Sequence, residues 1–327
     1  MRFVVFGAGA IGGVIGARLH QSGRDVVLIA RGRQLDAIRR GGLRVQDPDG
    51  EATLRIEAVA HPADARIGRE DVVILAMKSQ HTAAALADLR AAAPREVPMA
   101  CAQNGVANER MALRIFRNVY GISVLCPTAY LEPGVVQAYA APTTGILDVG
   151  RHPHDSDDLA AALVAAFRAA GFDAEAKPDI LRWKYAKLLD NLGNAVEIVC
   201  SPPARRGPIA RLAREEGVAC LRAAGIEFAE SRDRARIDAV RPRTVAGRER
   251  PGGSTWQSLA RGAGSVETDY LNGEVVLLGR SYGVPAPVNE LLQQLANELA
   301  RDGRPPGLLS EQDFFERLGG ASEATRR

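Results

Sequence analysis

Glycines near the start of the chain have the spacing of a phosphate-binding loop. An apolar stretch over residues 2–6 leads into a Gly-x-Gly-x-x-Gly run, and a helical pattern follows. In such a loop the first glycine makes a tight turn, the second lets the backbone approach a pyrophosphate, and the third lets the helix pack on the sheet. The helix then offers free N–H groups to the phosphates. The segment predicts a bound nicotinamide or flavin nucleotide, contacted by Gly7, Gly9, Ala10, Ile11 and Gly12.

Arg31 stands at the end of the next expected strand, residues 25–30. An acidic residue at this point binds the ribose 2′-hydroxyl of NAD, whereas a guanidinium suits the 2′-phosphate of NADP. The sequence Ala30-Arg31-Gly32-Arg33 therefore favours NADP(H). The alternative is a solvated run of charge.

Two more polar residues follow buried strands. Lys78 comes after the strand expected over 71–76, and Asn104 after the strand expected over 97–102. Ligands of open α/β sheets bind at the carboxyl ends of strands. Asn104-Gly105 is also an ordinary turn signal, but the two positions together predict a shared cleft.

Lysine is rare in this chain. Of its 42 lysines and arginines, only four are lysines, namely Lys78, Lys177, Lys184 and Lys187. Arginine therefore supplies the ordinary surface charge. A lysine retained in such a chain suggests a role that needs an amine able to release its proton.

Lys187 shares one face of a helix expected over 179–200 with two asparagines. On a helical wheel, Asn191 lies about 40° and Asn194 about 20° from Lys187, and leucines occupy the opposite arc. Asparagine is a poor helix former, so two in one stripe suggest that their amides are used. The alternative is a plain solvent face. Lys184, about 60° away on the wheel, is a competing amine.

A later helix, expected over 254–280, begins at Ser254 and contains Glu267. Taken alone, these are a capping serine and a helix carboxylate. His152 and His154 could suggest a metal ion, but they lie in a connecting loop. We therefore expect no metal site.

Strands and helices alternate as far as residue 176, with a hairpin expected over 43–59 and a last strand over 172–176. This pattern predicts an α/β fold with a doubly wound Rossmann-type sheet and a mixed edge. Beyond it the apolar periodicity is helical, which predicts an all-α domain. We expect a nucleotide-binding domain over 1–176, a helical substrate and catalytic domain over 177–300, and a partly disordered tail over 301–327.

Composition excludes several classes of protein. A net charge of +3 gives no broad basic field for nucleic acid. No apolar stretch is long enough to span a membrane. The four scattered cysteines fit reduced thiols of a cytoplasmic protein better than disulfides or a zinc site.

Together these motifs resemble the ketopantoate reductases (2-dehydropantoate 2-reductases), NADPH-dependent enzymes of pantothenate biosynthesis. The resemblance covers almost the whole chain. It implies a Rossmann domain followed by a helical domain similar to that of 6-phosphogluconate dehydrogenase. The matching residues are the glycine run, Arg31, Lys78, Gln103-Asn104-Gly105, Trp183, Lys187, Asn191, Ser254-x-Trp256-Gln257 and Glu267-x-Asp-Tyr-Leu-Asn-Gly273.

The resemblance implies a role for each position. Lys187 matches the proton donor and Glu267 the carboxylate that binds the substrate hydroxyl. Asn104 matches the asparagine that contacts substrate and nicotinamide, and Lys78 a lysine near the nucleotide. Ser254 and Asn191 match substrate-binding positions, with Asn194 as the candidate for a second helix asparagine. The expected partner is a small 2-keto acid, and a homodimer is compatible with the sequence.

The chain departs from the family pattern at two spacings. Asn194 comes seven residues after Lys187, where the family's second asparagine commonly comes eight after the lysine, and the interval from Ser254 to Glu267 is one residue longer than usual. Three functions stay open: reduction of ketopantoate, reduction of another 2-keto acid or ketone, and a non-catalytic NADP(H) sensor. The presence of both Lys187 and Glu267 argues against the sensor, which needs no proton donor.

Overall fold

Alternate side chains of the N-terminal strand point to opposite faces of a seven-stranded sheet, and both faces are apolar. In the computed structural model, which describes residues 1–230 and 234–324, every neighbouring pair of strands in this sheet is parallel except β8 and β11. The expected doubly wound sheet with a mixed edge is confirmed. The strand order is β11 (Ile146–Arg151), β8 (Val119–Leu125), β7 (Met99–Cys101), β6 (Asp71–Leu75), β1 (Arg2–Phe6), β2 (Val26–Ile29) and β5 (Glu57–Val59).

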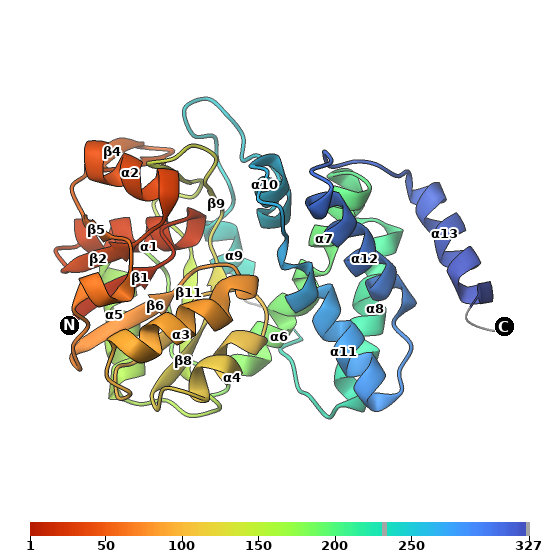
Figure 1. Cartoon of the computed structure of the whole chain (residues 1–327), viewed down its shortest axis with the longest axis horizontal. Coiled ribbons are helices and arrows are strands. Elements are labelled where there is room, and N and C mark those ends of the chain that lie inside the picture. Colours follow the sequence, from red (N-terminus) through yellow and green to blue (C-terminus); the bar gives the residue numbers. More distant parts are fainter. Residues whose placement is uncertain (231–233, 325–327) are drawn as a thin grey trace. The chain divides into compact units, whose positions relative to one another are not determined.

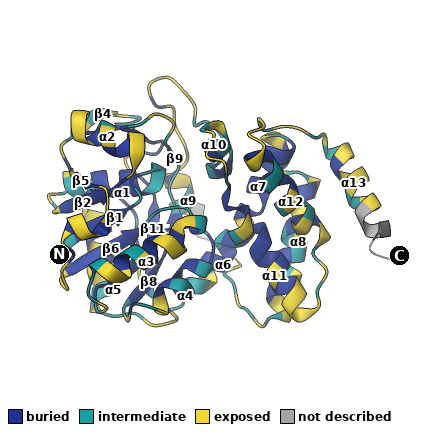
Figure 2. Cartoon of the chain, in the orientation of Figure 1, coloured by how far each residue is buried: buried dark blue, intermediate teal, exposed yellow. Residues whose placement is uncertain are grey.

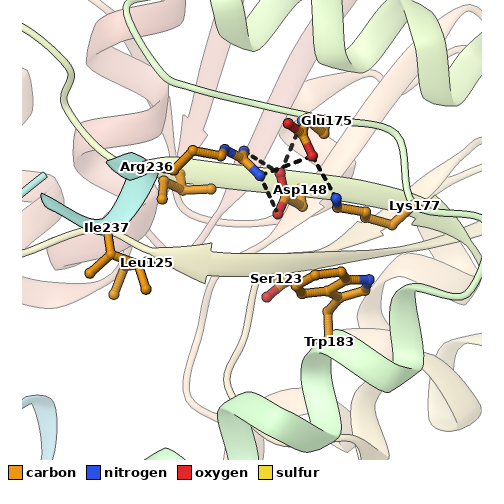
Figure 3. A pocket seen from close by; sticks show the side chains of 9 residues that line it. Ser123, Leu125, Asp148, Glu175, Lys177, Trp183, Arg236 and Ile237 are labelled. Carbon is orange, nitrogen blue, oxygen red and sulfur yellow. Dashed lines mark hydrogen bonds and ion pairs between the residues drawn. The ribbon is translucent and has the colours of Figure 1, made fainter. Parts of the chain in front are cut away.

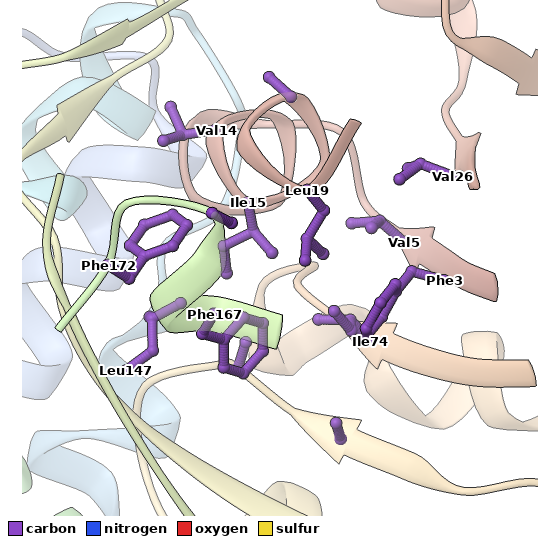
Figure 4. Close-up of a cluster of buried hydrophobic side chains, with 14 of the residues drawn as sticks. Phe3, Val5, Val14, Ile15, Leu19, Val26, Ile74, Leu147, Phe167 and Phe172 are labelled. Carbon is purple, nitrogen blue, oxygen red and sulfur yellow. The ribbon is translucent and has the colours of Figure 1, made fainter. Parts of the chain in front are cut away.

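Helices cover the two faces of this sheet (Figure 1). Phe3 and Val5 pack with α1 (Ala10–Gln21) and α5 (Asp158–Ala169) in one apolar cluster (Figure 4). Val4 and Phe6 belong to a second cluster, with α3 (Thr82–Ala92) and α4 (Ala107–Leu113). Burial on both faces explains why the strands read as continuous apolar runs.

A second, four-stranded sheet corrects the expected hairpin over 43–59. Its order is β4 (Gly50–Leu54), β3 (Leu43–Asp47), β10 (Val135–Ala138) and β9 (Thr128–Ala129). The hairpin thus ends at residue 54, and β5 joins the large sheet beside β2 instead. Residues 172–176 form only isolated bridges to β11. Helix α2 (Gly32–Gly41) contacts both β3 and β5.

The described residues divide into two compact units whose boundaries differ from the expected domains. The first unit comprises 1–184 together with 229–250, and the second comprises 185–228 together with 251–327. The returning segment 229–250 contains α9 (Arg234–Ala239). Arg236 holds this segment to the first unit through ion pairs with Asp148 at 2.7 Å and Asp173 at 2.6 Å. The order of residues along the chain gives no sign of this return.

The second unit is helical. Helix α7 (Gly193–Val199) is buried along its whole length (Figure 2) and contacts α8 (Pro208–Ala223), α10 (Ser254–Ala260) and α12 (Pro287–Arg301). Helix α11 (Asn272–Tyr282) packs on both α8 and α12. The single helix expected over 179–200 is two, because Leu192 separates α6 (Ile180–Asn191) from α7.

A further expectation in the second unit is wrong. The helix expected over 254–280 is interrupted after α10, where Gly262 and Gly264 take φ angles of +65° and +68° that end a helix. A short 3₁₀ turn, η4 (Glu267–Tyr270), then precedes α11.

The tail, for which partial disorder is expected, contains a helix, α13 (Glu311–Ala324). Ser310 Oγ accepts from the Asp313 nitrogen at 3.0 Å, and Asp313 Oδ2 accepts from the Ser310 nitrogen at 3.1 Å, which makes a capping box. Phe314 is fully buried. Residues 325–327, also expected to be disordered, lie outside the described residues.

Candidate active site

The glycine loop has the geometry that its sequence predicts. Gly7 has a φ of +108°, and a Cβ added there would lie 2.7 Å from the Met77 nitrogen. A Cβ on Gly12 would lie 2.1 Å from the Gly7 carbonyl oxygen, so only glycine lets α1 start this close to β1. Both positions therefore require glycine for the fold of the loop itself.

At position 9, packing would allow a residue larger than glycine. A Cβ there would meet nothing nearer than a Tyr130 ring carbon at 4.0 Å, so the space beside its backbone is open. Gly9 caps α1 without a side-chain hydrogen bond, and the first turn, which includes Ala10 and Ile11, carries no acidic residue. Open space beside free N–H groups at a helix start fits a pyrophosphate.

Arg31 lies at the carboxyl end of β2, beside the glycine loop. Its side chain is 61% exposed, and its guanidinium lies 5.7 Å from the centroid of the Phe6 ring and pairs with Asp88 of α3 at 3.0 Å. Arg31 is thus placed to meet a phosphate at this sheet edge. The sequence did not point to Asp88, because its approach to Arg31 depends on how α3 packs.

The ends of β6 and β7 are joined by a buried polar network. Ser79, next to Lys78, donates to the Asn104 carbonyl at 3.3 Å and accepts from Asn108 at 3.1 Å. Asn108 also donates to the Asn104 carbonyl and accepts from Thr82 at 2.7 Å. The loops that carry Lys78 and Asn104 therefore lie together, as expected from adjacent parallel strands.

Lys184 is not a free amine. It is 3% exposed and forms an ion pair with Glu109, which is fully buried. Its ammonium also donates to the carbonyls of Gln103 at 3.0 Å and Cys101 at 3.4 Å. Burial, and next the Glu109 charge, raise the pKa of the Cys101 thiol well above its usual range. These bonds hold the Lys184 ammonium on buried acceptors of the first unit.

The asparagines after Lys187 are buried rather than solvated. Lys187 is half-buried on α6, whereas Asn191 and Asn194 are 4% and 2% exposed. Within the described residues, Asn191 Nδ2 and Asn194 Oδ1 have no hydrogen-bond partner. The expected alternative of a solvent face is therefore wrong. A buried amide without a partner costs about 1–3 kcal/mol, so these atoms are suited to receive a ligand.

The break between α6 and α7 is held by a residue from another helix. Leu192 keeps helical angles, φ −60° and ψ −32°, and its carbonyl accepts from Asn272 of α11 at 3.3 Å. Asn272 also donates to Asn289, which donates in turn to Glu216 at 2.8 Å. Asn272 belongs to the motif that begins at Glu267, and its role here is to support the helix that carries the asparagines.

Ser254 begins α10, but it does not cap it: the cap is Gly253, without a side-chain bond. Glu197 of α7 accepts from the Gly253 nitrogen at 2.7 Å and pairs with Arg205 at 3.2 Å. A Cβ on Gly253 would lie 2.3 Å from the Glu197 carboxylate. Glu197, which the sequence did not single out, thus fixes the turn that presents Ser254.

Glu267 lies in the 3₁₀ turn η4 and not inside a long helix, and it is 2% exposed. The turn contacts α11 and α12. The expected helix-surface carboxylate is therefore a buried one, and buried carboxylates need specific partners.

Figure 3 shows a pocket in the first unit that contains none of the predicted site residues. Arg236 and Lys177 line it together with the carboxylates they pair with, and Lys177 also lies 4.4 Å from the Trp183 ring. These charges balance one another and join 229–250 to the edge of the sheet. Among the described residues there is no cluster of metal ligands, and no helix is long and apolar enough to cross a membrane.

Two family models match the chain. Ketopantoate reductase PanE/ApbA matches residues 3–153, and Ketopantoate reductase PanE/ApbA C terminal matches residues 179–300. A 2-dehydropantoate 2-reductase of Archaeoglobus fulgidus is 30% identical over 303 residues, which cover 90% of this chain and 96% of the relative.

Solved structures have the same fold. The PanE/ApbA family ketopantoate reductase of Ralstonia eutropha JMP134 is 28% identical, with a TM-score of 0.76 over 93% of this chain and 99% of that chain. D-mandelate dehydrogenase, solved with NADH and anilino(oxo)acetate, is 22% identical with a TM-score of 0.77 over the same shares, a likeness of fold alone.

Proposed function

Since the chain belongs to the ketopantoate reductase family, we propose that it reduces 2-dehydropantoate to pantoate with NADPH, in pantothenate biosynthesis. The family is one of NAD(P)-dependent oxidoreductases that act on 2-keto acids. The choice of substrate, the preference for NADPH and the roles of single residues are our proposal. The observation that carries it is a pair of buried amide atoms on the helical stretch that follows Lys187. Asn191 Nδ2 and Asn194 Oδ1 have no hydrogen-bond partner within the described residues.

Residues of the first unit fit the nucleotide. The loop at Gly7, Gly9 and Gly12 receives the pyrophosphate, with Ala10 and Ile11 in the first turn of α1. Arg31 binds the 2′-phosphate, and its exposure leaves the guanidinium accessible. Lys78 and Asn104 follow the neighbouring strands, where the nicotinamide end of a dinucleotide lies in open sheets.

Residues of the second unit handle the substrate. Asn191, Asn194 and Ser254 orient the carboxylate and carbonyl, and Glu267 accepts a hydrogen bond from the substrate hydroxyl. When bound, the nicotinamide supplies a hydride to the keto carbon. Lys187 stabilises the negative charge that develops on the oxygen and then donates a proton to it. A lysine ammonium suits this step, because an alkoxide is a far stronger base than an amine.

The second candidate is reduction of another 2-keto acid. The spacing of seven residues from Lys187 to Asn194 favours it, because the family's second asparagine commonly comes eight residues after the lysine. A difference of one methyl group in a pocket changes selectivity by only about 10- to 200-fold and leaves no motif.

The test is oxidation of NADPH and of NADH with a panel of 2-keto acids that includes 2-dehydropantoate, a linear acid and a phenyl-substituted acid. We expect the highest kcat/KM with 2-dehydropantoate and NADPH. A higher value with another acid selects the second candidate. Tight NADPH binding without turnover of any acid selects the sensor. The four free cysteines are compatible with the cytoplasmic location that we propose.

A further inference from the structure

A buried ion pair contacts the chain both before and after the turn that contains Asn104. Lys184 donates to the carbonyls of Cys101 and Gln103, which precede Asn104. The same ammonium pairs with Glu109, which follows Asn104 in α4. The side chains of Lys184 and Glu109 are 2% and 0% exposed, and all five residues belong to the first unit.

This arrangement needs a lysine. The ammonium is compact and has three donors, and here its contacts are two carbonyls and a carboxylate. The planar fork of an arginine could not make the same three contacts in the same space. In a chain that otherwise uses arginine for positive charge, this geometry explains why residue 184 is a lysine.

A buried ion pair is a poor device for stability, because desolvation offsets much of the attraction. The ion pair instead fixes the positions of the groups around it, since each contact of the ammonium holds a backbone carbonyl or the Glu109 side chain of α4. The Ser79 and Asn108 bonds hold the Asn104 carbonyl from the other side. The backbone of residue 104 is thus fixed, while its side chain makes none of these bonds.

We infer that Lys184 and Glu109 are positioning residues, which hold the Gln103–Gly105 turn so that the Asn104 amide meets the nicotinamide and the keto acid. The inference rests on the proposed function, which gives Asn104 that contact. A misplacement of about 1 Å in such a group can cost about 100-fold in rate. Lys184 therefore acts through Asn104 and donates no proton in the reaction.

The experiment compares the double variant Lys184→Met/Glu109→Met, the variant Asn104→Ala and the triple variant. The paired methionines keep the volume and leave no orphan charge, so we expect thermal stability close to that of the wild type. We expect kcat to fall about 10- to 100-fold, with Kd for NADPH within about twofold and a larger isotope effect from deuterated NADPH. The triple variant should lose no more than Asn104→Ala alone.

Lys177→Met is the matched control, because Lys177 also pairs with a carboxylate in the first unit but touches no part of the Asn104 turn. Its kcat should be unchanged. If the double variant does not fold, Glu109→Gln, which keeps an acceptor for the ammonium, supplies the same comparison. Losses that add in the triple variant, or an unchanged kcat in the folded double variant, would overturn the inference. A wild type that turns over no 2-keto acid would instead remove the proposed function and this inference with it.

Discussion

The two units carry their candidate residues in different ways. In the first, the nucleotide loop is backbone: two glycines are imposed by contacts of 2.1 and 2.7 Å, and a third leaves space. In the second, the site is made of buried side chains whose places depend on distant residues, such as Asn272 at the helix break and Glu197 at the Ser254 turn. A backbone site is specified locally, whereas a side-chain site is specified by packing.

The largest effect should come from the second unit. Replacing Lys187 with alanine removes the proposed proton donor, which typically costs 10²- to 10⁴-fold in rate. NADPH should still bind, and Lys187→Arg should not restore turnover, because a guanidinium keeps its proton. Steady-state kinetics and NADPH fluorescence titration measure the two effects. An active Lys187→Ala enzyme would remove the proton-donor role.

The next effect lies in the first unit, at Arg31. Arg31→Ala should weaken NADPH binding by about 10- to 150-fold, equivalent to about 1.5–3 kcal/mol for a charged hydrogen bond, and leave NADH binding nearly unchanged. Asp88→Asn is the opposite perturbation. It releases Arg31 from an exposed ion pair, which is worth up to about 1 kcal/mol, and should tighten NADPH binding up to about fivefold. Equal changes for both nucleotides would contradict the assignment.

Two glycine variants separate fold from binding within one loop. Gly12→Ala places a Cβ 2.1 Å from a backbone oxygen, so we expect a loss of about 1–3 kcal/mol of stability, seen as a Tm lower by several degrees. Gly9→Ala meets open space, so its Tm should stay near that of the wild type while NADPH binding weakens. Equal Tm values for the two variants would show that the loop relaxes around either methyl group.

The smallest effect concerns pH. Burial, more than any other cause, lowers the pKa of His152 below its ordinary 6.5. The Glu109 charge opposes this shift, and the Lys184 charge adds to it. Below pH 6.5, His152 therefore binds a proton more readily in the unfolded chain than in the folded chain. This contribution to stability is complete above pH 6.5 and is lost as the pH falls through the folded value. Urea unfolding at several pH values should show a steeper decline below pH 6.5 for the wild type than for His152→Gln.

The places of the candidate residues in the fold could be predicted from the sequence better in the first unit than in the second. Gly7, Gly12 and Arg31 follow directly from their positions after strands, because parallel strands bring their carboxyl ends to one edge. The break at Leu192 involves a hydrogen bond from Asn272, and the turn at Glu267 follows two glycines with positive φ. Helical periodicity shows neither feature, so it predicted one continuous helix in each region. The helix over 311–324 was missed although Ser310 and Asp313 carry a capping signal.

Lys184 shows the same limit from another side. The rarity of lysine in this chain suggested a chemical role for it, but helical periodicity showed only its angle from Lys187 around the helix. The partner that decides its role, Glu109, lies far earlier in the chain. No local pattern links the two positions.

The return of residues 229–250 bears on whether the two units could be inherited or exchanged as separate modules. A polypeptide ending at residue 184 would lack Arg236, and Asp148, Asp173 and Glu175 would then face one another without the cation they share. Lys177 would still pair with Glu175, but Asp148, which is buried, and Asp173 would repel each other. Recombination at the apparent junction would therefore produce an acid-rich, weakened sheet edge. A viable exchange has to carry the distant segment along with the first 184 residues.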